Sequence, residues 1–191
     1  IPMNKNGIDM ESLENTNAQV VHISPSHHFP TGIVTPIGRR YELLSWASKS
    51  SSHYIIEDDY DSEFRFIGKP IPALQSIDAM EKVIYINTFS KSLSSTIRIS
   101  YMVLPKNLMK KYNQELNFYS CTVSNFEQYT LASFIGEGYF EKHINRMRNY
   151  YRSQRDLIMD CIKKHPNYHR VQIAEENSGL HFLLHVDTNL S

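Results

Sequence analysis

The sequence predicts an α/β protein with a mixed, mostly parallel sheet and the beginning of a second lobe. Short runs rich in β-branched and aromatic residues alternate with stretches whose apolar residues recur at helical spacing. The strongest strand patterns, at residues 53–57 and 82–86, are mainly apolar, which is typical of strands buried on both faces. A charged amphipathic helix is predicted over residues 139–164, and its length indicates a connector between lobes.

The first part of the chain contributes one strand and one helix. Residues 1–17 are polar and are predicted to be irregular, and a short strand at 19–23 ends at a Ser-Pro-Ser turn. A turn-rich loop at 27–32 follows. Apolar residues at helical spacing then predict an amphipathic helix over 36–49, with Pro36 acceptable as its first residue.

The chain is predicted to reverse direction after the two central strands. Only about ten residues separate the strand at 82–86 from a further strand at 98–104, which is too few for a helical crossover and predicts an antiparallel return. Pro105 then opens a helix that runs towards Tyr119, and another helix is predicted over about 125–136.

The predicted elements divide the chain into three parts. Residues 1–138 form part of a large domain, residues 139–165 form the interdomain helix, and residues 166–191 begin a small α+β domain. Strands at 169–173 and 179–186, separated by a polar turn, are the predicted elements of that small domain.

The composition limits which class of protein this chain can belong to. The chain has 191 residues, of which 41% are hydrophobic, and 20 Lys plus Arg balance 20 Asp plus Glu, so the charge gives no support for a nucleic-acid or membrane-surface partner. No apolar run reaches the roughly 18 residues that a membrane span needs. Because the sequence opens without an initiator methionine and ends just after a strand, we expect a piece of a longer protein that lacks both flanks.

The two cysteines and nine histidines suggest neither a redox nor a metal site. Cys121 and Cys161 are far apart and match no zinc or redox spacing, which predicts buried or inert thiols and fits the reducing cytoplasm. Of the histidines, only the adjacent His27 and His28 form a close pair, and their side chains diverge if the segment is extended. We therefore predict no metal site.

One lysine follows a predicted strand in a setting that favours imine chemistry. An amine forms an imine with an aldehyde only when it is deprotonated, and partial burial near positive charge lowers the pKa of a lysine. Lys91 lies in such a segment, a few residues before Arg98, whose guanidinium can hold a phosphate through two hydrogen bonds. Thr88 and Ser90 can add hydroxyl donors to the same phosphate.

A carboxylate and a phenol follow the neighbouring predicted strand. If the aldehyde is pyridoxal 5′-phosphate, the pyridine nitrogen must stay protonated, and Asp58 is the natural partner for it. Tyr60 can donate to the 3-oxygen of the ring. Alone, each residue has an ordinary alternative, namely a surface lysine, a helix cap, a metal ligand or a structural ion pair. Their joint order favours the cofactor, since ligands of open α/β sheets gather at the carboxyl ends of strands.

Several motifs resemble a known family. EDDYDSEF at residues 57–64, TFSKSL at 88–93 and RISYMVLP at 98–105 resemble the aminotransferase-like domain of MocR-type bacterial transcription regulators of the GntR group. SPSHHFPTG at 24–32 and RMRNYYR at 146–152 are also similar to that group. The resemblance spans nearly the whole chain.

The resemblance implies a fold type I, pyridoxal-phosphate-dependent architecture with a three-layer, mixed and mostly parallel sheet. It makes Lys91 the Schiff-base lysine, Asp58 the partner of the pyridine nitrogen and Tyr60 the partner of the 3-oxygen. It places three further side chains at the phosphate, those of Thr88, Ser90 and Arg98. It also implies a homodimer, and DNA binding only through a winged-helix domain that precedes this chain.

The sequence departs from ordinary aminotransferases of this fold at two loops. They carry Asn-Pro-Thr-Gly where this chain has Phe29 to Gly32, so either His27 or His28 replaces the asparagine contact to the cofactor, or both histidines shape the loop. Residues 94–96 stand where relatives often have a Pro-Gly turn.

Two further groups of side chains have ordinary interpretations. Four arginines on the helix at 139–164 are interleaved with acidic residues, which favours a solvated interlobe helix over a nucleic-acid surface. Five aromatic residues in the preceding segment are predicted to serve as core and dimer-contact residues, namely Tyr112, Phe118, Tyr119, Phe126 and Tyr129.

These inferences predict an effector domain of a cytoplasmic transcription regulator. An internal aldimine through Lys91 is exchanged for an external aldimine with an amino compound or amino acid, and this exchange shifts the lobes. The first alternative is a catalytically active class I/II aminotransferase in which Lys91 acts as general base. The second is a cofactor-free scaffold or dimerisation piece. We expect the 191 residues by themselves to be inactive and to hold the cofactor weakly.

Overall fold

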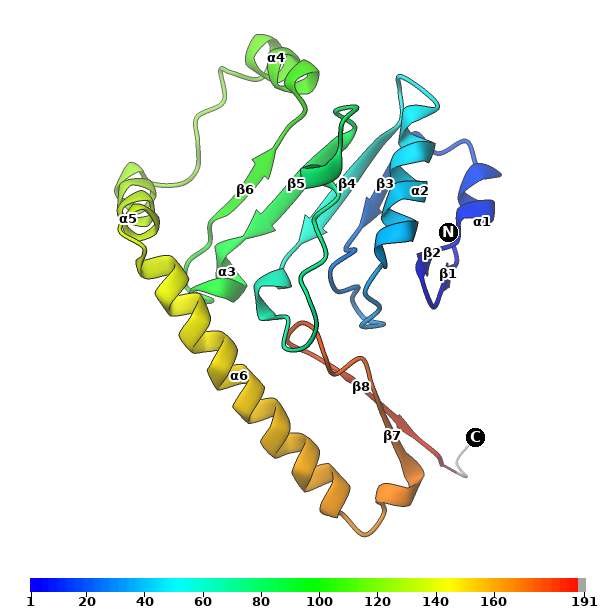
Figure 1. The fold of residues 1–191 in the computed structure, drawn as a ribbon. Helices are drawn as coiled ribbons and strands as arrows, with labels where there is room; N and C mark the ends of the chain where they lie inside the picture. The colour runs from blue at the N-terminus through cyan, green and yellow to red at the C-terminus, as the bar shows by residue number, and fades with distance from the viewer. Residues whose placement is uncertain (189–191) are drawn as a thin grey trace.

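The chain is built around a four-stranded sheet, seen in a computed structural model that describes residues 1–188. The strand order is β3 (Val20–Ile23), β4 (Tyr54–Asp59), β5 (Val83–Thr88) and β6 (Ser100–Val103). The pairs β3–β4 and β4–β5 are parallel, whereas β6 runs antiparallel to β5 (Figure 1). The predicted mixed, mostly parallel sheet and its antiparallel return are confirmed.

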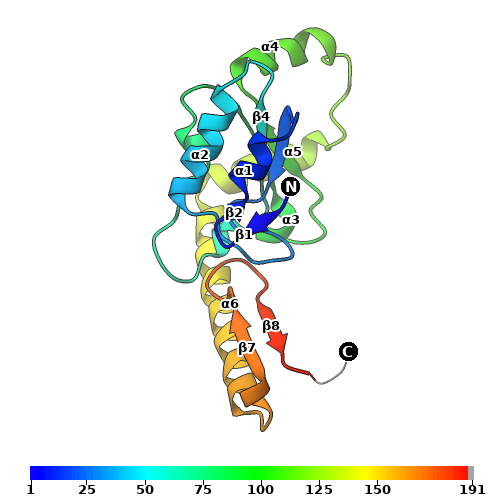
Figure 2. The same cartoon turned by 90° about the vertical axis from the view of Figure 1, so that its right-hand side faces the viewer.

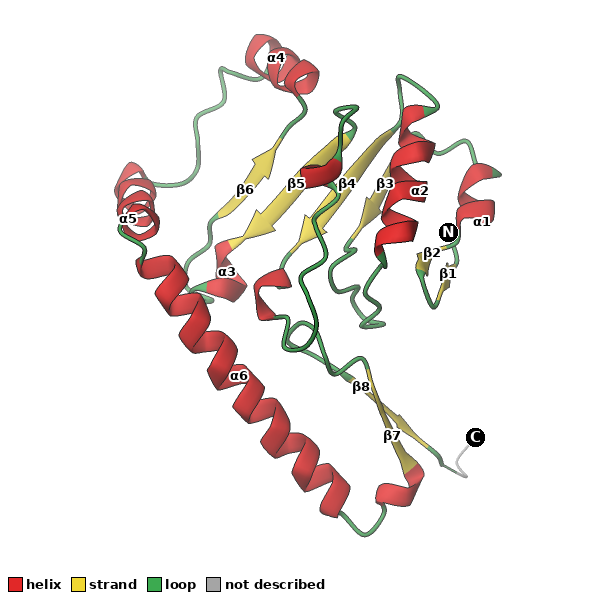
Figure 3. Cartoon of the chain, in the orientation of Figure 1, coloured by secondary structure: helices red, strands yellow, loops and turns green. Residues whose placement is uncertain are grey.

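The helices follow the predicted pattern closely (Figure 3). Helix α2 (Ile37–Ser48) occupies the segment predicted at 36–49, and α6 (Tyr139–Lys164) begins after Gly138, which has a positive φ of 75°. The helix predicted from Pro105 ends earlier than expected. The two helices between β6 and α6 are α4 (Lys106–Glu115) and α5 (Asn125–Gly136).

Residues 1–17 are more ordered than predicted. They form the short antiparallel pair β1 (Met3–Asn4) and β2 (Gly7–Ile8), followed by helix α1 (Met10–Glu14). The Asp9 side chain accepts a hydrogen bond from the Ser12 amide at 2.9 Å and so caps α1. The prediction of an irregular segment was therefore wrong, because polar residues here serve turns and a cap rather than disorder.

One face of the sheet is covered by a hydrophobic core. Leu43 and Ala47 of α2 are fully buried, and they belong to one cluster with Ile55 of β4 and Val83 of β5. Burying a leucine, isoleucine or valine side chain stabilises a fold by about 1.5–3 kcal/mol. The rest of the cluster comes from the N-terminal segment, β3, α2 and the connector before β5, namely Ile8, Leu13, Val21, Trp46 and Leu74.

The opposite face of the sheet is open among the described residues. Along β4 burial alternates strictly, so that Ile55, Glu57 and Asp59 are buried whereas Ile56 and Asp58 are only half-buried. Met102 of β6, in register with the β5 residue that pairs with Asp58, is 48% exposed. The prediction of strands buried on both faces was wrong for this part of the chain, since its helices cover one face only.

Helix α6 and a hairpin extend away from the sheet in the same direction (Figures 1 and 2). The hairpin pairs β7 (Val171–Ala174) with β8 (Leu183–Val186) in antiparallel register. Three arginines fasten α6 to other segments by donating to backbone carbonyls at 2.9–3.1 Å. These bonds run from Arg148 to Glu63, from Arg152 to Phe66 and from Arg155 to Glu176. They support the structural interpretation of this helix.

Two groups of side chains are more exposed than expected. Cys121 and Cys161 are exposed free thiols, which excludes the buried alternative of the prediction and leaves the inert one. The aromatic residues predicted to be partly core are exposed by between 39% and 79%, and α4 and α5 contain no buried residue within the described chain. No helix in the described range is long and apolar enough to span a bilayer.

Candidate functional site

The carboxyl ends of the neighbouring parallel strands β4 and β5 lie side by side at the same end of the sheet. Asp58 is the penultimate residue of β4 and pairs in register with Ile86 of β5. Helix α3 (Phe89–Ser92), which carries Lys91, begins directly after β5 ends at Thr88 (Figure 1). The aspartate and the lysine therefore lie at two neighbouring strand ends.

The segment that carries Lys91 is held by local hydrogen bonds. The Ser90 amide donates to Thr88 Oγ1 at 3.2 Å, so Thr88 is the N-cap of α3. Ser90 Oγ donates to the Ile97 carbonyl at 2.8 Å, and the Phe89 amide donates to the Ile99 carbonyl at 2.9 Å. These bonds bring the backbone of residue 98 beside the first turn of α3.

Two cations of this segment face solvent. Lys91 and Arg98 are exposed, and neither side chain has a hydrogen bond or ion pair to another described residue. The hydroxyl hydrogens of Thr88 and Ser90 are directed to the carbonyls of Ile99 and Ile97. Arg98 is therefore the free donor for an anionic group in this arrangement, and the two hydroxyls must rotate before they can donate to one.

Asp58 has a partner that the sequence analysis missed. His22 of β3 places Nε2 3.3 Å from Asp58 Oδ2, and both side chains are partly exposed. His22 is in register with Ile56, two residues before Asp58, so the two side chains share the open face. In the sequence, the alternation of side chains along β3 was the only signal for His22. This alternation does not say which strand lies beside β3.

Tyr60 lies on the loop that follows β4 and is a hydrogen-bond donor. Its hydroxyl donates to the His27 carbonyl at 2.7 Å. Burial raises the pKa of Tyr60 well above its ordinary value, and the carboxylates of Asp61 and Asp58 act in the same direction. The phenol is therefore protonated at neutral pH.

The two adjacent histidines shape their loop. His27 is buried, and its Nδ1 lies 2.8 Å from Asp61 Oδ2, which also accepts a bond from the Leu180 amide at 3.0 Å. His28 Nδ1 lies 2.8 Å from Thr31 Oγ1. This geometry favours the structural alternative for both residues.

A group of possible ligand atoms also forms around His27. Atoms of His27, Asp61 and His181 lie within 4.8 Å of one another, although these residues are far apart in sequence. His27 Nδ1 is already engaged by Asp61, and ring centroids of His27 and His181 are 4.0 Å apart. The spacing of histidines in the sequence alone does not reveal this group.

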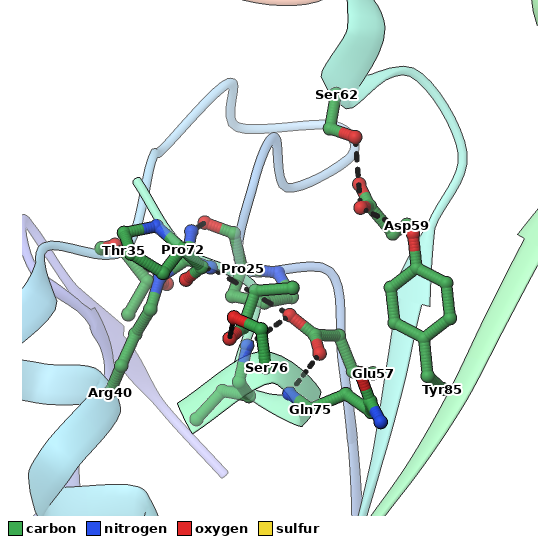
Figure 4. A network of polar contacts seen from close by, with 12 residues as sticks. Pro25, Thr35, Arg40, Glu57, Asp59, Ser62, Pro72, Gln75, Ser76 and Tyr85 are labelled. Atoms are coloured by element: carbon green, nitrogen blue, oxygen red, sulfur yellow. Dashed lines mark hydrogen bonds and ion pairs between the residues drawn. The ribbon is translucent and has the colours of Figure 1, made fainter. Parts of the chain in front are cut away.

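A buried network of charged and polar groups lies on the covered side of the sheet (Figure 4). Arg40 is fully buried, and its Nη1 lies 3.7 Å from Glu57 Oε1. Glu57 also accepts from the amides of Leu74 and Gln75 at 2.8 and 2.9 Å. Burial raises the pKa of Glu57, whereas these amides and Arg40 lower it. The guanidinium donates at 2.9–3.1 Å to three carbonyls, those of Pro25, Thr35 and Pro72.

The network fixes the strand that carries Asp58. Glu57 and Asp59 are anchored on the covered face, one residue on either side of Asp58. Because side chains alternate along a strand, anchoring both neighbours directs Asp58 to the open face. The covered face therefore holds the strand, and the open face presents Asp58.

Comparison with known proteins shows the family. The family model for aminotransferase class I and II matches residues 1–190. The chain therefore belongs to the aminotransferase class I and II family.

Two curated relatives are bacterial regulators. The chain is 46% identical over 186 residues to an uncharacterized HTH-type transcriptional regulator, YdeL, of Bacillus subtilis (strain 168), covering 97% of this chain and 40% of the relative. It is 33% identical over 165 residues to the probable rhizopine catabolism regulatory protein MocR of Rhizobium meliloti, covering 86% of this chain and 33% of that protein. The chain thus spans less than half the length of these relatives.

Solved aminotransferases share the fold. The kynurenine aminotransferase of Pyrococcus horikoshii, solved in complex with PMP, is 29% identical with a TM-score of 0.77, and the match covers 94% of this chain and 46% of that one. The α-aminoadipate aminotransferase LysN of Thermus thermophilus has a TM-score of 0.80 at 24% identity, covering 100% of this chain and 50% of its own. The expected family resemblance and the fold type I aminotransferase architecture are confirmed.

Proposed function

We propose that this chain is the cofactor-binding part of an aminotransferase-like effector domain in a transcription regulator, and that pyridoxal 5′-phosphate attaches to Lys91. The proposal rests chiefly on the placement of Asp58 and Lys91 at the ends of adjacent strands in an aminotransferase fold. The residues fit the group chemically, because a carboxylate, a protonated phenol, a lysine and a free guanidinium face the same end of the sheet.

Each side chain has a defined task in the proposal. When bound, the cofactor supplies an electron-accepting ring and an aldehyde carbon. The Asp58 carboxylate holds the proton on the pyridine nitrogen, and His22 orients that carboxylate. Tyr60 donates to the 3-oxygen once its hydroxyl leaves the His27 carbonyl. The Arg98 guanidinium binds the phosphate, with the hydroxyls of Thr88 and Ser90 as secondary contacts.

Sensing of a small amino compound is the favoured role. The regulators similar to this chain extend well beyond it, which supports an arrangement in which DNA is bound by a winged-helix domain elsewhere in a cytoplasmic protein. We retain the division into residues 1–138, 139–165 and 166–191, since α6 and the β7–β8 pair extend away from the sheet. The exposed aromatic residues of the α4–α5 region suit a homodimer contact.

Transamination is the second candidate. The 29% identity to a kynurenine aminotransferase favours it, and Lys91 is free of competing contacts within the described chain. Under this alternative the released Lys91 amine moves a proton at the substrate Cα. A cofactor-free scaffold is the remaining alternative.

Attachment of the cofactor to one lysine tests the proposal. The full-length protein is mixed with pyridoxal 5′-phosphate, reduced with borohydride and digested, and the modified peptide is identified by mass spectrometry. We expect a visible absorbance band before reduction and modification at Lys91. Lys91→Ala should abolish both, whereas Lys110→Ala on exposed α4 should change neither. A band that persists in Lys91→Ala contradicts the assignment, and its absence from the wild type favours the scaffold.

Addition of an amino-acid panel separates the two active roles. A spectral change that persists without loss of the cofactor aldehyde favours sensing. Conversion of the cofactor to its pyridoxamine form, with release of a keto acid, favours transamination.

A further inference from the structure

A second cleft lies on the covered side of the sheet, away from Lys91. It has a volume of about 420 Å³ and forms where the end of β4, the loop after it and α6 meet. Arg40 lines it as well, but that guanidinium is engaged by three carbonyls and Glu57. The other charged side chains of the cleft are Asp59, Glu63, Arg65, Arg148 and Arg152. Asp59 and Asp58 are consecutive on one strand, so their side chains face opposite sides of the sheet.

Two carboxylates in the cleft have unsatisfied oxygens. Asp59 is 4% exposed, and its Oδ2 accepts from Ser62 Oγ at 2.8 Å and from the Tyr85 hydroxyl at 2.9 Å (Figure 4). Its Oδ1 is buried with no partner among the described residues, and the same holds for Glu63 Oε2. A buried oxygen without a donor is unfavourable, and a ligand that donates to it removes that penalty. Burial accordingly raises the pKa of both carboxyl groups.

Three guanidinium groups in the cleft have donors to spare. Arg65 Nε is buried and unpartnered within the described structure. Arg148 donates to the Glu63 carbonyl and to Asn145, and Arg152 donates only to the Phe66 carbonyl. Each guanidinium carries five N–H donors, so most of them remain available.

The opposite charges in the cleft do not pair with each other. The ion pairs found over residues 1–188 with N···O distances up to 4.0 Å include none of these five side chains. No ion pair within 4.0 Å therefore neutralises these five groups in the described structure. A bare anion would meet two carboxyl groups and a bare cation would meet three guanidinium groups, so a molecule with both charges is the best match.

We propose that this cleft binds a small zwitterion of the amino-carboxylate class, with its ammonium group at Asp59 and Glu63 and its carboxylate at Arg65, Arg148 and Arg152. The site does not require the cofactor, because it faces the opposite side of the sheet from Asp58. It joins β4 to α6, whose arginines lie 85 or more residues from their carbonyl partners. A bound zwitterion would therefore link the sheet to the long helix.

Calorimetry on the full-length Lys91→Ala protein, prepared without pyridoxal 5′-phosphate, tests this site free of imine chemistry. Glycine, β-alanine and 5-aminopentanoate are titrated in turn, because they differ in the separation of the two charges. We expect at least one to bind. Propionate and propylamine, which each carry one of the two charges of β-alanine, should bind roughly tenfold more weakly or not at all.

Variants locate the binding. Glu63→Gln and Arg152→Gln should each weaken the affinity roughly tenfold or more. Arg146→Gln, an exposed arginine of the same helix, is the matched control and should not change it. Because Arg152 is itself largely exposed, Arg152→Gln is expected to fold normally, which circular dichroism checks.

Three outcomes would overturn the proposal. They are no binding of any of the three zwitterions, equal binding of propionate or propylamine, and binding that Glu63→Gln and Arg152→Gln leave unchanged. Failure here is distinguishable from failure of the proposed function, which is read from the absorbance and the modified peptide of the Lys91 protein.

Discussion

The two faces of strand β4 differ in how their polar groups are satisfied. On the covered face, Glu57 is fully buried and accepts two backbone hydrogen bonds beside Arg40. On the open face, Asp58 is partly exposed and has one contact, to the more exposed His22. Consecutive residues of the same chemical type thus occupy opposite environments. The difference shows that Glu57 holds the fold, whereas the oxygens of Asp58 remain accessible from the open face.

The difference also explains why acidic residues follow each other in the EDD sequence. A buried carboxylate is tolerated only with partners, and Glu57 has them in Arg40 and two amides. A carboxylate for a ligand must keep its oxygens accessible, as Asp58 does.

Replacing Arg40 should have the largest effect on stability. Arg40→Met leaves Glu57 as a buried charge and three carbonyls without donors, so we expect a loss of about 3–5 kcal/mol in the free energy of unfolding. Urea unfolding followed by the fluorescence of Trp46, the single tryptophan, measures this loss. Arg146→Met on exposed α6 is the control and should change stability little. If Arg40→Met lost less stability than Arg146→Met, the covered face would not have the structural role assigned to it.

Apolar truncations compare the two faces directly. Leu43→Ala on α2 creates a cavity in the buried cluster and should cost about 2–5 kcal/mol. Met102→Ala on the open face should cost less than about 0.5 kcal/mol, since that side chain is 48% exposed. The same urea titration compares both variants. Equal losses would show that the open face is covered in solution.

The pH dependence of stability should reveal the half-buried Glu63. Burial raises the pKa of Glu63, and the nearby Asp59 raises it further. The folded chain therefore binds this proton more tightly than the unfolded chain. Stability should fall as the pH rises from the unfolded carboxyl pKa of about 4.3 through the raised folded value.

Glu63→Gln isolates this contribution, because the amide does not titrate. The stability of Glu63→Gln relative to wild type should increase with pH across that interval. Glu115→Gln on exposed α4 should show no such trend. Thermal unfolding at a series of pH values measures it, and a parallel pH profile for wild type and Glu63→Gln would argue against a buried carboxyl group.

Replacing Asp58 should have the smallest effect on stability and a clear effect on the proposed ligand. Asp58→Asn removes a partly exposed contact with His22 and should change the free energy of unfolding by less than about 1 kcal/mol. Affinity for pyridoxal 5′-phosphate, measured by spectroscopic titration of the full-length protein, should fall. Unchanged affinity together with a large loss of stability would reverse the roles assigned to the two faces.

Local patterns in the sequence predicted most of the fold. The short connection before residue 98 predicted the antiparallel β6, and helical spacing predicted α2, α5 and α6. The two central strands extend further than predicted, through Asp59 and Thr88, because polar residues can continue a hydrogen-bonded ladder after the apolar pattern stops. The strands predicted at 98–104 and 179–186 are shorter than expected. The open face was missed, since an apolar strand pattern does not say which segment covers it.

For the candidate sites, the sequence analysis could not predict contacts between residues that are far apart in the chain. The placement of Lys91 and Asp58 at neighbouring strand ends could be predicted, because each comes soon after an apolar strand pattern. The cleft at Asp59 and the partner of Asp58 on β3 could not, because their contacts join residues that are far apart in the chain. Arg148 and Glu63 are 85 positions apart, and no spacing rule reaches that far.

The hydrogen bonds around α3 indicate the order in which parts of the molecule fold. Thr88 bonds to a carbonyl 11 residues away, whereas Asp61 bonds to an amide 119 residues away. The entropy lost on closing a loop grows with its length, so the turn that carries Lys91 forms at a lower entropic cost than the contacts with α6 and the hairpin. We expect this turn to order early in folding. Its contact with the long helix, between His143 Nε2 and the Ser92 carbonyl at 3.1 Å, spans 51 residues and should form later.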